Sequence, residues 1–295
     1  MKLLKLLTFS AVLTVCGQLK ANDMTVTSPN GRLTATVNDD NGLTLAVSLD
    51  GKVLLAPSPI GLTLANGTAI GRDKKAGFGL TATMTDDTDA PFYRQRHIRT
   101  VGKQLDLKLG HGFGLQVRAY NEGVAYRFYT SNKRETIIAN ETADFRFPEE
   151  SKGWLAYTTN PEKPYAMAFQ NTFHETHLVD ARPLPVFLPA TVEVPGGEKV
   201  TILESDLRAY PGMFLKADGD ALRAEFAKYP KKMAYYKWRG MSYVEETEDY
   251  IAKSTGARTY PWRVMAITEK DTEMPVNNLV YALATPNQIG DTSWI

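Results

Sequence analysis

One stretch of the chain, residues 154–178, concentrates the side-chain types that could bind a sugar. Its aromatic residues offer flat apolar rings, while its amides, carboxylates and imidazoles offer directional hydrogen-bonding groups. A hexose has apolar faces and a rim of hydroxyl groups, so this mixture suits a carbohydrate ligand. The residues of these types are Trp154, Tyr157, Asn160, Glu162, Tyr165, Phe169, Gln170, Asn171, Phe173, His174, Glu175 and His177. The alternative interpretation is a rim loop of a β domain whose aromatic residues belong to the core.

The sequence shows no complete catalytic constellation. Glycoside hydrolysis requires two carboxyl groups across a cleft, whereas the Glu-Glu pairs at 149–150 and 245–246 are adjacent residues, which point apart on a strand. His174 and His177 lie three residues apart, but zinc would need a third ligand and a helix to hold that spacing. The glycine-rich run at 110–114 precedes no helical pattern, so it is a turn and not a phosphate loop. The residues by themselves therefore assign no reaction to the chain.

Composition and the first residues limit the class of protein. The 295 residues carry a net charge of +1 and are 43% hydrophobic, as in an ordinary globular protein. This near-neutral charge gives no electrostatic footprint for nucleic acid. Residues 1–21 begin with Lys2 and Lys5 and continue with a short apolar run, which predicts a signal peptide and a periplasmic protein, with no membrane span. The only cysteine, Cys16, lies in this segment, but Val15 before it disfavours an outer-membrane lipoprotein.

From Met24 onward, apolar and polar residues alternate with the period of two that is typical of half-buried β-strands. Asp50-Gly51 between two apolar runs indicates a hairpin. One or two helical turns are expected at 221–228. The strand segments are 33–37, 43–49, 78–84, 105–109, 115–119, 124–128, 190–194, 199–203, 262–267 and 279–283. This spacing predicts an all-β fold, a large antiparallel β-supersandwich of two packed sheets with few short helices.

Seven short phrases are spread along the chain after the signal segment. They are Ser28-Pro29-Asn30-Gly31, Asn121-Glu122-Gly123-Val124-Ala125-Tyr126-Arg127-Phe128, Glu204-Ser205-Asp206-Leu207, Tyr210-Pro211-Gly212-Met213, Tyr260-Pro261-Trp262-Arg263-Val264, Asn277-Asn278-Leu279-Val280 and Asp291-Thr292-Ser293-Trp294-Ile295. In this order and spacing they resemble the N-terminal domain of glycoside hydrolase family 97, a family of bacterial α-glucosidases and α-galactosidases. The resemblance covers essentially the whole chain after the signal segment.

The resemblance implies a larger protein with an N-terminal β-supersandwich, a catalytic (β/α)₈ barrel and a small C-terminal β domain. It places the sandwich at residues 22–290 and the start of the linker to the barrel at residues 291–295. The family's general acid and its base or nucleophile lie on the barrel, which is absent from this sequence. No catalytic residue is therefore assigned, and the chain is expected to be inactive alone.

The resemblance also implies a share in the sugar site. In family members this domain covers the barrel mouth and contributes a glutamate to a Ca²⁺ ion beside the sugar. Glu162 is the match, because the family tends to place this glutamate shortly before an aromatic residue, here Tyr165. Ca²⁺ takes about 6–8 oxygen ligands, so this chain alone should bind it weakly. The residues expected at the sugar are Tyr165, Asn171, His174 and Glu175, and the last two are the next metal-ligand candidates if Glu162 is buried.

Three interpretations remain open at this point. The chain is the substrate-proximal part of a calcium-dependent α-glycosidase, or a stand-alone periplasmic carbohydrate-binding module, or a non-functional remnant of a truncated gene. In the first case its partners are an α-linked glucose or galactose oligosaccharide and a catalytic barrel, missing or separately encoded. The choice of glucose or galactose, and of retention or inversion, depends on the barrel. A domain built to cover a barrel should also expose an apolar patch and self-associate.

Overall fold

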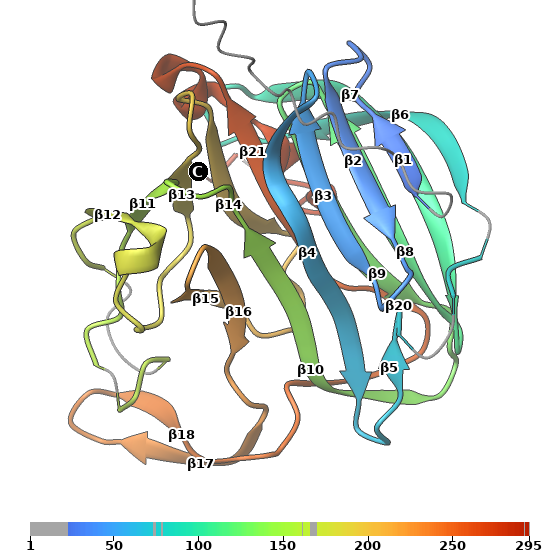
Figure 1. The fold of residues 1–295 in the computed structure, drawn as a ribbon. Coiled ribbons are helices and arrows are strands. Elements are labelled where there is room, and N and C mark those ends of the chain that lie inside the picture. Colours follow the sequence, from blue (N-terminus) through green and yellow to red (C-terminus); the bar gives the residue numbers. More distant parts are fainter. Residues whose placement is uncertain are drawn as a thin grey trace, which may run out of the picture.

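The computed structural model describes residues 23–72, 75–77, 79–160, 162–165, 170–291 and 293–294. The predicted signal peptide, residues 1–21, lies outside these ranges. Two large antiparallel sheets pack face to face, and a separate two-stranded hairpin lies at one end of the molecule (Figure 1). The expected all-β supersandwich is therefore confirmed, and the described ranges contain no (β/α)₈ barrel.

The first sheet has nine strands in the order β1-β2-β3-β4-β10-β16-β15, with β5 paired to β4 and β19 to β10. Its strands are β1 (Met24–Thr27), β2 (Leu33–Asn38), β3 (Thr44–Leu49), β4 (Lys52–Leu64), β5 (Ala69–Ile70), β10 (Glu135–Arg146), β15 (Met213–Asp218), β16 (Ala221–Phe226) and β19 (Ala252–Thr255). The β3–β4 turn is the predicted Asp50-Gly51 hairpin, with φ of 49° and 82° at its two residues. Two consecutive positive φ values are what a tight hairpin of right-handed twist requires.

The second sheet has ten strands in the order β12-β11-β13-β14-β21-β9-β8-β7-β6, with β20 paired to β9. Its strands are β6 (Leu80–Asp89), β7 (His97–Gly110), β8 (Phe113–Tyr120), β9 (Gly123–Thr130), β11 (Lys152–Leu155), β12 (His174–His177), β13 (Ala190–Glu193), β14 (Lys199–Ser205), β20 (Arg258–Thr259) and β21 (Trp262–Thr268). The hairpin is β17 (Pro230–Tyr236) with β18 (Met241–Thr247), and the helices are η1 (Leu178–Asp180), η2 (Asp271–Val276) and α1 (Leu279–Ala282). None of the helices in the described part has the length and apolar character needed to traverse a bilayer.

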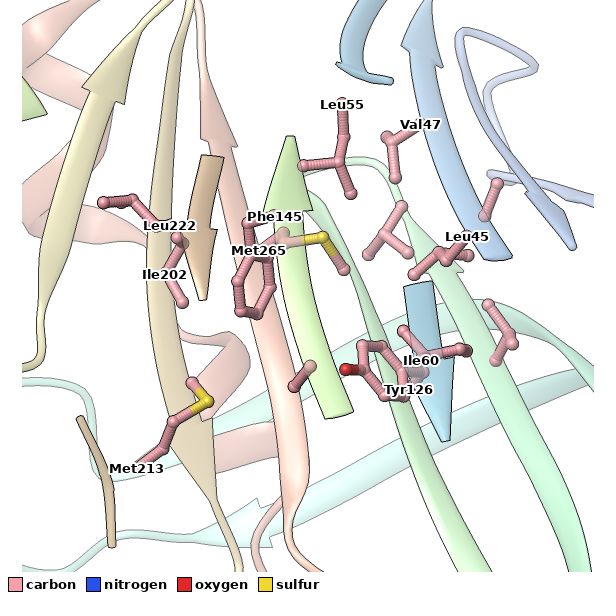
Figure 2. Packing of buried hydrophobic residues seen from close by; sticks show 14 of the residues in the cluster. Leu45, Val47, Leu55, Ile60, Tyr126, Phe145, Ile202, Met213, Leu222 and Met265 are labelled. Atoms are coloured by element: carbon pink, nitrogen blue, oxygen red, sulfur yellow. The ribbon is translucent and has the colours of Figure 1, made fainter. Parts of the chain in front are cut away.

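The core fills the space between the two sheets. Strand β2 buries Leu33, Ala35 and Val37 and leaves the residues between them half-buried, as the period of two predicts. Full burial of a leucine or valine side chain stabilises the fold by about 1.5–3 kcal/mol relative to exposure. Figure 2 shows this layer, and its labelled side chains come from both sheets: Leu45, Val47, Leu55, Ile60, Tyr126, Phe145, Ile202, Met213, Leu222 and Met265.

Two predicted elements are of the wrong type. The helical turns expected at 221–228 are the strand β16, which lies between β10 and β15 and pairs with both. Pairing on two sides outweighs the modest helical preference of this short segment. The strand expected at 279–283 is the helix α1 and its C-cap. Leu279, Ala282 and Leu283 follow helical spacing, and all three are buried against the second sheet.

Strand β6 exists as predicted, but its apolar side is not buried. Leu80 is 69% exposed and Ala82 is also exposed, while Phe78 lies outside the described residues. β6 is the edge strand of the second sheet, and none of its described residues belongs to the main core. The alternation of apolar and polar residues predicts a strand, but the position of the strand in the sheet decides which of its faces is buried.

The β6–β7 hairpin contains a histidine whose pKa depends on two neighbouring carboxylates. His97 lies between two carboxylates, with its Nδ1 3.0 Å from Asp89 and its Nε2 3.2 Å from Asp87. The hydrogen bond that His97 donates to the Asp89 carboxylate, followed by the negative charge of Asp87, raises the pKa of His97 above its ordinary value. The folded state therefore favours protonated His97, and this contribution to stability is lost as the pH rises through the raised pKa.

We expect Asp89→Asn to lower the pKa of His97, because the substitution removes the hydrogen-bonding carboxylate. An NMR titration of the His97 imidazole protons measures this directly. Asp218→Asn, on the other sheet, is the matched control and should leave the His97 titration unchanged. An identical titration in the Asp89 variant and the unmodified chain would contradict the assigned cause.

Candidate functional site

The predicted sugar-binding segment is a long loop at the edge of the second sheet. It follows β11 and ends at β12, which pairs antiparallel with β11; between the two strands the structure describes residues 156–160, 162–165 and 170–173. Leu155 and His174 are directly opposite each other in this pairing, so the two ends of the loop are closed together. In the view of Figure 1, the described parts of the loop lie at the same end of the sandwich as the β17–β18 hairpin.

Tyr157 fastens the start of this loop to the sandwich. It forms a β-bridge with Val186, which in turn bridges to Leu215 on β15. Its hydroxyl accepts a hydrogen bond of 3.2 Å from the backbone amide of Arg182, and its carbonyl accepts one of 2.8 Å from the Asn171 side chain. Tyr157 is only 3% exposed, so it supports the loop and is not free to stack on a sugar. The Asn171 amide likewise has a structural partner.

Glu162 lies in a tight turn that the Asn160 side chain organises. The Asn160 Oδ1 accepts hydrogen bonds from the backbone amides of Glu162 (3.0 Å) and Lys163 (3.2 Å). An asparagine that bonds to the backbone two residues ahead fixes such a turn. The Glu162 side chain is exposed, and no described residue forms a salt bridge with it. The carboxylate therefore has the accessibility expected of a metal ligand, and its role remains a prediction.

Tyr165 anchors the other side of this turn to the first sheet. Its ring packs edge-on against Phe214 of β15 at a centroid distance of 4.9 Å. The Phe214 ring also lies 5.9 Å from the ring of Phe187. Burial raises the pKa of the Tyr165 hydroxyl. The residue is half-buried, so part of the ring is committed to packing and the remainder is available to a ligand.

His174 and Glu175 face opposite sides of β12, because neighbouring residues alternate along a strand. The His174 ring lies 5.9 Å from the Tyr157 ring. Glu175 is exposed opposite Trp154, and its carboxylate is 3.7 Å from the Lys152 ammonium group. The structure thus groups Asn171, Tyr157 and His174, and it separates Glu175 from that group. Contact of any of these residues with a sugar remains a prediction.

The described residues include no group of three or more His, Cys, Asp or Glu side chains arranged to hold a metal ion. Glu149 and Glu150 are exposed and, with His177 and Asp180, line an open hollow of about 360 Å³. This agrees with the interpretation of the Glu-Glu pair as solvated surface. Glu162 fits a Ca²⁺ ion as one oxygen ligand among several, not as a complete site.

A buried ion-pair triad, which the sequence did not reveal, supports the face that carries Phe214. Arg263 on β21 donates two hydrogen bonds to Glu141 on β10, of 2.7 and 2.8 Å, and one of 2.8 Å to Glu204 on β14. Arg263 and Glu141 are 1% and 3% exposed. Glu204 also accepts the backbone amide of Met213, the residue before Phe214, at 3.1 Å. The triad therefore joins the two sheets and fixes the start of β15.

The family model described as glycosyl-hydrolase 97 N-terminal matches residues 26–286. The chain belongs to glycoside hydrolase family 97. A retaining α-galactosidase from Bacteroides thetaiotaomicron is 34% identical over 99% of this chain and 46% of its own length. A probable retaining α-galactosidase from Streptomyces bingchenggensis is 25% identical over 86% of this chain and 36% of its own length. The family 97 chain thus spans less than half the length of these relatives.

Solved structures agree with this family at the level of the fold. A family 97 enzyme from Pseudoalteromonas sp. strain K8, in complex with acarbose, has a TM-score of 0.74 at 18% identity and is matched over 92% of this chain and 39% of its own. A β-arabinopyranosidase has a TM-score of 0.68 at 17% identity, over 83% of this chain and 40% of its own. At this identity the likeness shows the supersandwich alone.

Proposed function

We propose that this family 97 chain is the substrate-proximal, non-catalytic part of an α-galactosidase. The observation that carries the proposal is the match to the Bacteroides α-galactosidase, which is 34% identical over 99% of this chain but extends well beyond the matched region. The catalytic acid and its partner carboxylate would lie in the region that this chain does not match. The chain would shape the sugar site through the loop between β11 and β12, and it would act in the periplasm.

We further propose that Glu162 is this domain's ligand to a Ca²⁺ ion at that site. Three features support the assignment: the side chain is exposed, no described residue neutralises it, and Asn160 fixes the backbone beneath it. A hard cation prefers carboxylate oxygens and needs about 6–8 oxygen ligands, so the remaining ligands must come from the partner and from water. Galactose is the favoured sugar because both curated relatives are α-galactosidases.

The isolated chain is expected to hydrolyse p-nitrophenyl α-galactoside no faster than buffer, because no acid–base pair can be assigned among its described residues. A fusion in which this chain replaces the matched region of the Bacteroides α-galactosidase is expected to turn the substrate over. The remainder of that enzyme, expressed without either N-terminal region, is the control. Turnover by the isolated chain that survives repurification would contradict the proposal, as would a folded fusion that is inactive on α-galactosides.

A further inference from the structure

The β17–β18 hairpin projects from the sandwich and, among the described residues, joins neither of the two large sheets. It forms a sheet of its own, and neither strand hydrogen-bonds to a third strand in the described part of the chain. At the base, the Tyr229 carbonyl accepts the backbone amide of Glu248 and the Tyr229 amide donates to the Tyr250 carbonyl, both at 2.8 Å. An isolated two-stranded hairpin is only marginally stable in water. Its projection therefore requires a further explanation.

Both faces of this hairpin are apolar. Met233, Tyr235 and Val244 lie on one face, and they are 54%, 59% and 43% exposed. The opposite face carries Met241, which is 50% exposed, and the stacked rings of Tyr236 and Tyr243, whose centroids are 4.1 Å apart. Exposed apolar residues gathered in this way mark an interaction surface.

The turn between the two strands is aromatic and cationic. Trp238 is 75% exposed, and the guanidinium of Arg239 lies 4.3 Å from the centroid of its ring. Lys232, further down the strand, forms a 2.7 Å salt bridge with Glu245, whereas no described acidic residue forms a salt bridge with Lys237 or Arg239. A partner that receives this turn should therefore present carboxylates near an apolar recess.

A protein groove fits this hairpin better than a sugar does. A sugar platform needs one open flat face, whereas here the apolar residues lie on both faces and Arg239 covers one side of Trp238. Tryptophan, tyrosine, methionine and arginine are the residue types enriched at protein–protein interfaces. Insertion between two protein surfaces would bury both faces of the hairpin at once.

We propose that the β17–β18 hairpin is a docking arm for the polypeptide that the α-galactosidase relatives carry beyond the matched region. More than half of the Bacteroides enzyme lies outside the match, which supplies a partner of sufficient size. The turn inserts into a groove with apolar walls and carboxylates that receive Lys237 and Arg239. This inference rests on the proposed function, because it takes the catalytic part of that enzyme as the occupant.

Trypsin footprinting tests the arm on the isolated chain and on the Bacteroides fusion. We expect rapid cleavage after Lys237 and Arg239 in the isolated chain, and cleavage at least about 10-fold slower in the fusion, where the turn is covered. Lys133 and Arg134, exposed before β10, are the internal control and should be cut equally in both proteins. A variant with Tyr235→Ser, Trp238→Ser and Met241→Ser should leave the unfolding midpoint of the isolated chain unchanged and lower that of the fusion.

The outcomes separate the arm from the proposed function. Protection in an inactive fusion supports the arm and contradicts the function, whereas an active fusion cut as fast as the isolated chain overturns the arm alone. Protection of the isolated chain that grows with protein concentration would assign the hairpin to a second copy and overturn the proposal. Protection of the isolated chain by raffinose would show that the hairpin binds a sugar, and this would also overturn the proposal. A fusion that does not fold also counts against the arm, because the proposal requires the hairpin to fit the remainder of the Bacteroides enzyme.

Discussion

Arg263→Met is expected to lower the free energy of unfolding of this chain by about 3–5 kcal/mol, the usual cost of breaking a buried ion pair. The guanidinium is 1% exposed and is shared by Glu141 and Glu204, so its loss leaves two carboxylates without their counter-charge between the sheets. The methionine retains the aliphatic volume, which limits the contribution of a cavity. Urea unfolding followed by circular dichroism measures the change.

The pH dependence of this variant identifies the electrostatic cause. Burial raises the pKa of Glu204, and Arg263 opposes that rise. Without Arg263 the folded-state pKa rises further, so the folded variant binds protons more tightly than its unfolded chain does. The variant should therefore gain stability relative to the unmodified chain as the pH falls toward the ordinary pKa of glutamate.

Lys253→Met is the matched control for the triad, because it removes an exposed salt bridge of 3.0 Å to Glu135. Exposed pairs contribute little, since water screens both charges. We expect the control to unfold at the same denaturant concentration as the unmodified chain. The triad would be shown not to hold the sheets together by either of two results. One is a loss of unfolding free energy in Arg263→Met no larger than that in Lys253→Met, and the other is a loss that does not change with pH.

The local pattern predicts the strands and the turns, because those depend on neighbouring residues. Leu115, Val117 and Ala119 alternate in sequence and are all buried on β8. The glycine-rich run at 110–114 is the predicted turn between β7 and β8, and His111 and Gly112 there have φ of 53° and 76°. The local pattern predicts the wrong element type at 221–228 and 279–283, because contacts with residues distant in the chain decide the conformation of these two segments.

The site depends more on distant contacts, so the sequence predicts its residue types better than its geometry. His174 and Glu175 are neighbours in sequence, but pairing of β12 with β11 sends them to opposite faces. The triad joins Arg263 to Glu141 and Glu204, which precede it by 122 and 59 residues in the chain. No local pattern reveals contacts over such separations. The apolar hairpin has a local signal, the run of aromatic and basic residues at 235–239, although its isolation from both sheets follows only from the topology.

Glu162→Gln is expected to weaken Ca²⁺ binding by the Bacteroides fusion by at least about 10-fold, since even residues that only support metal ligands change affinity by that factor. The amide keeps the size of the side chain and one oxygen, but it removes the charge that a hard cation favours. Because Glu162 is exposed, its substitution should not disturb folding, so a folding defect would not explain a loss of Ca²⁺ affinity. Calorimetric titration of the metal-stripped fusion with Ca²⁺ measures the affinity, and the Ca²⁺-dependent rise in its unfolding midpoint provides a second readout.

Glu175→Gln tests the specificity of this assignment, because Glu175 is also exposed and lies on β12 just after the same loop, but its carboxylate faces Lys152. If Glu162 is the ligand, this variant binds Ca²⁺ as the unmodified fusion does. A large loss in Glu175→Gln with normal binding in Glu162→Gln would move the metal to the outer face of β12. Equal Ca²⁺ affinity in all three proteins would exclude both carboxylates, and the metal would then be held without either side chain. The turn that Asn160 fixes distinguishes these cases, because Asn160→Ala should weaken binding only if the metal depends on the backbone position of Glu162.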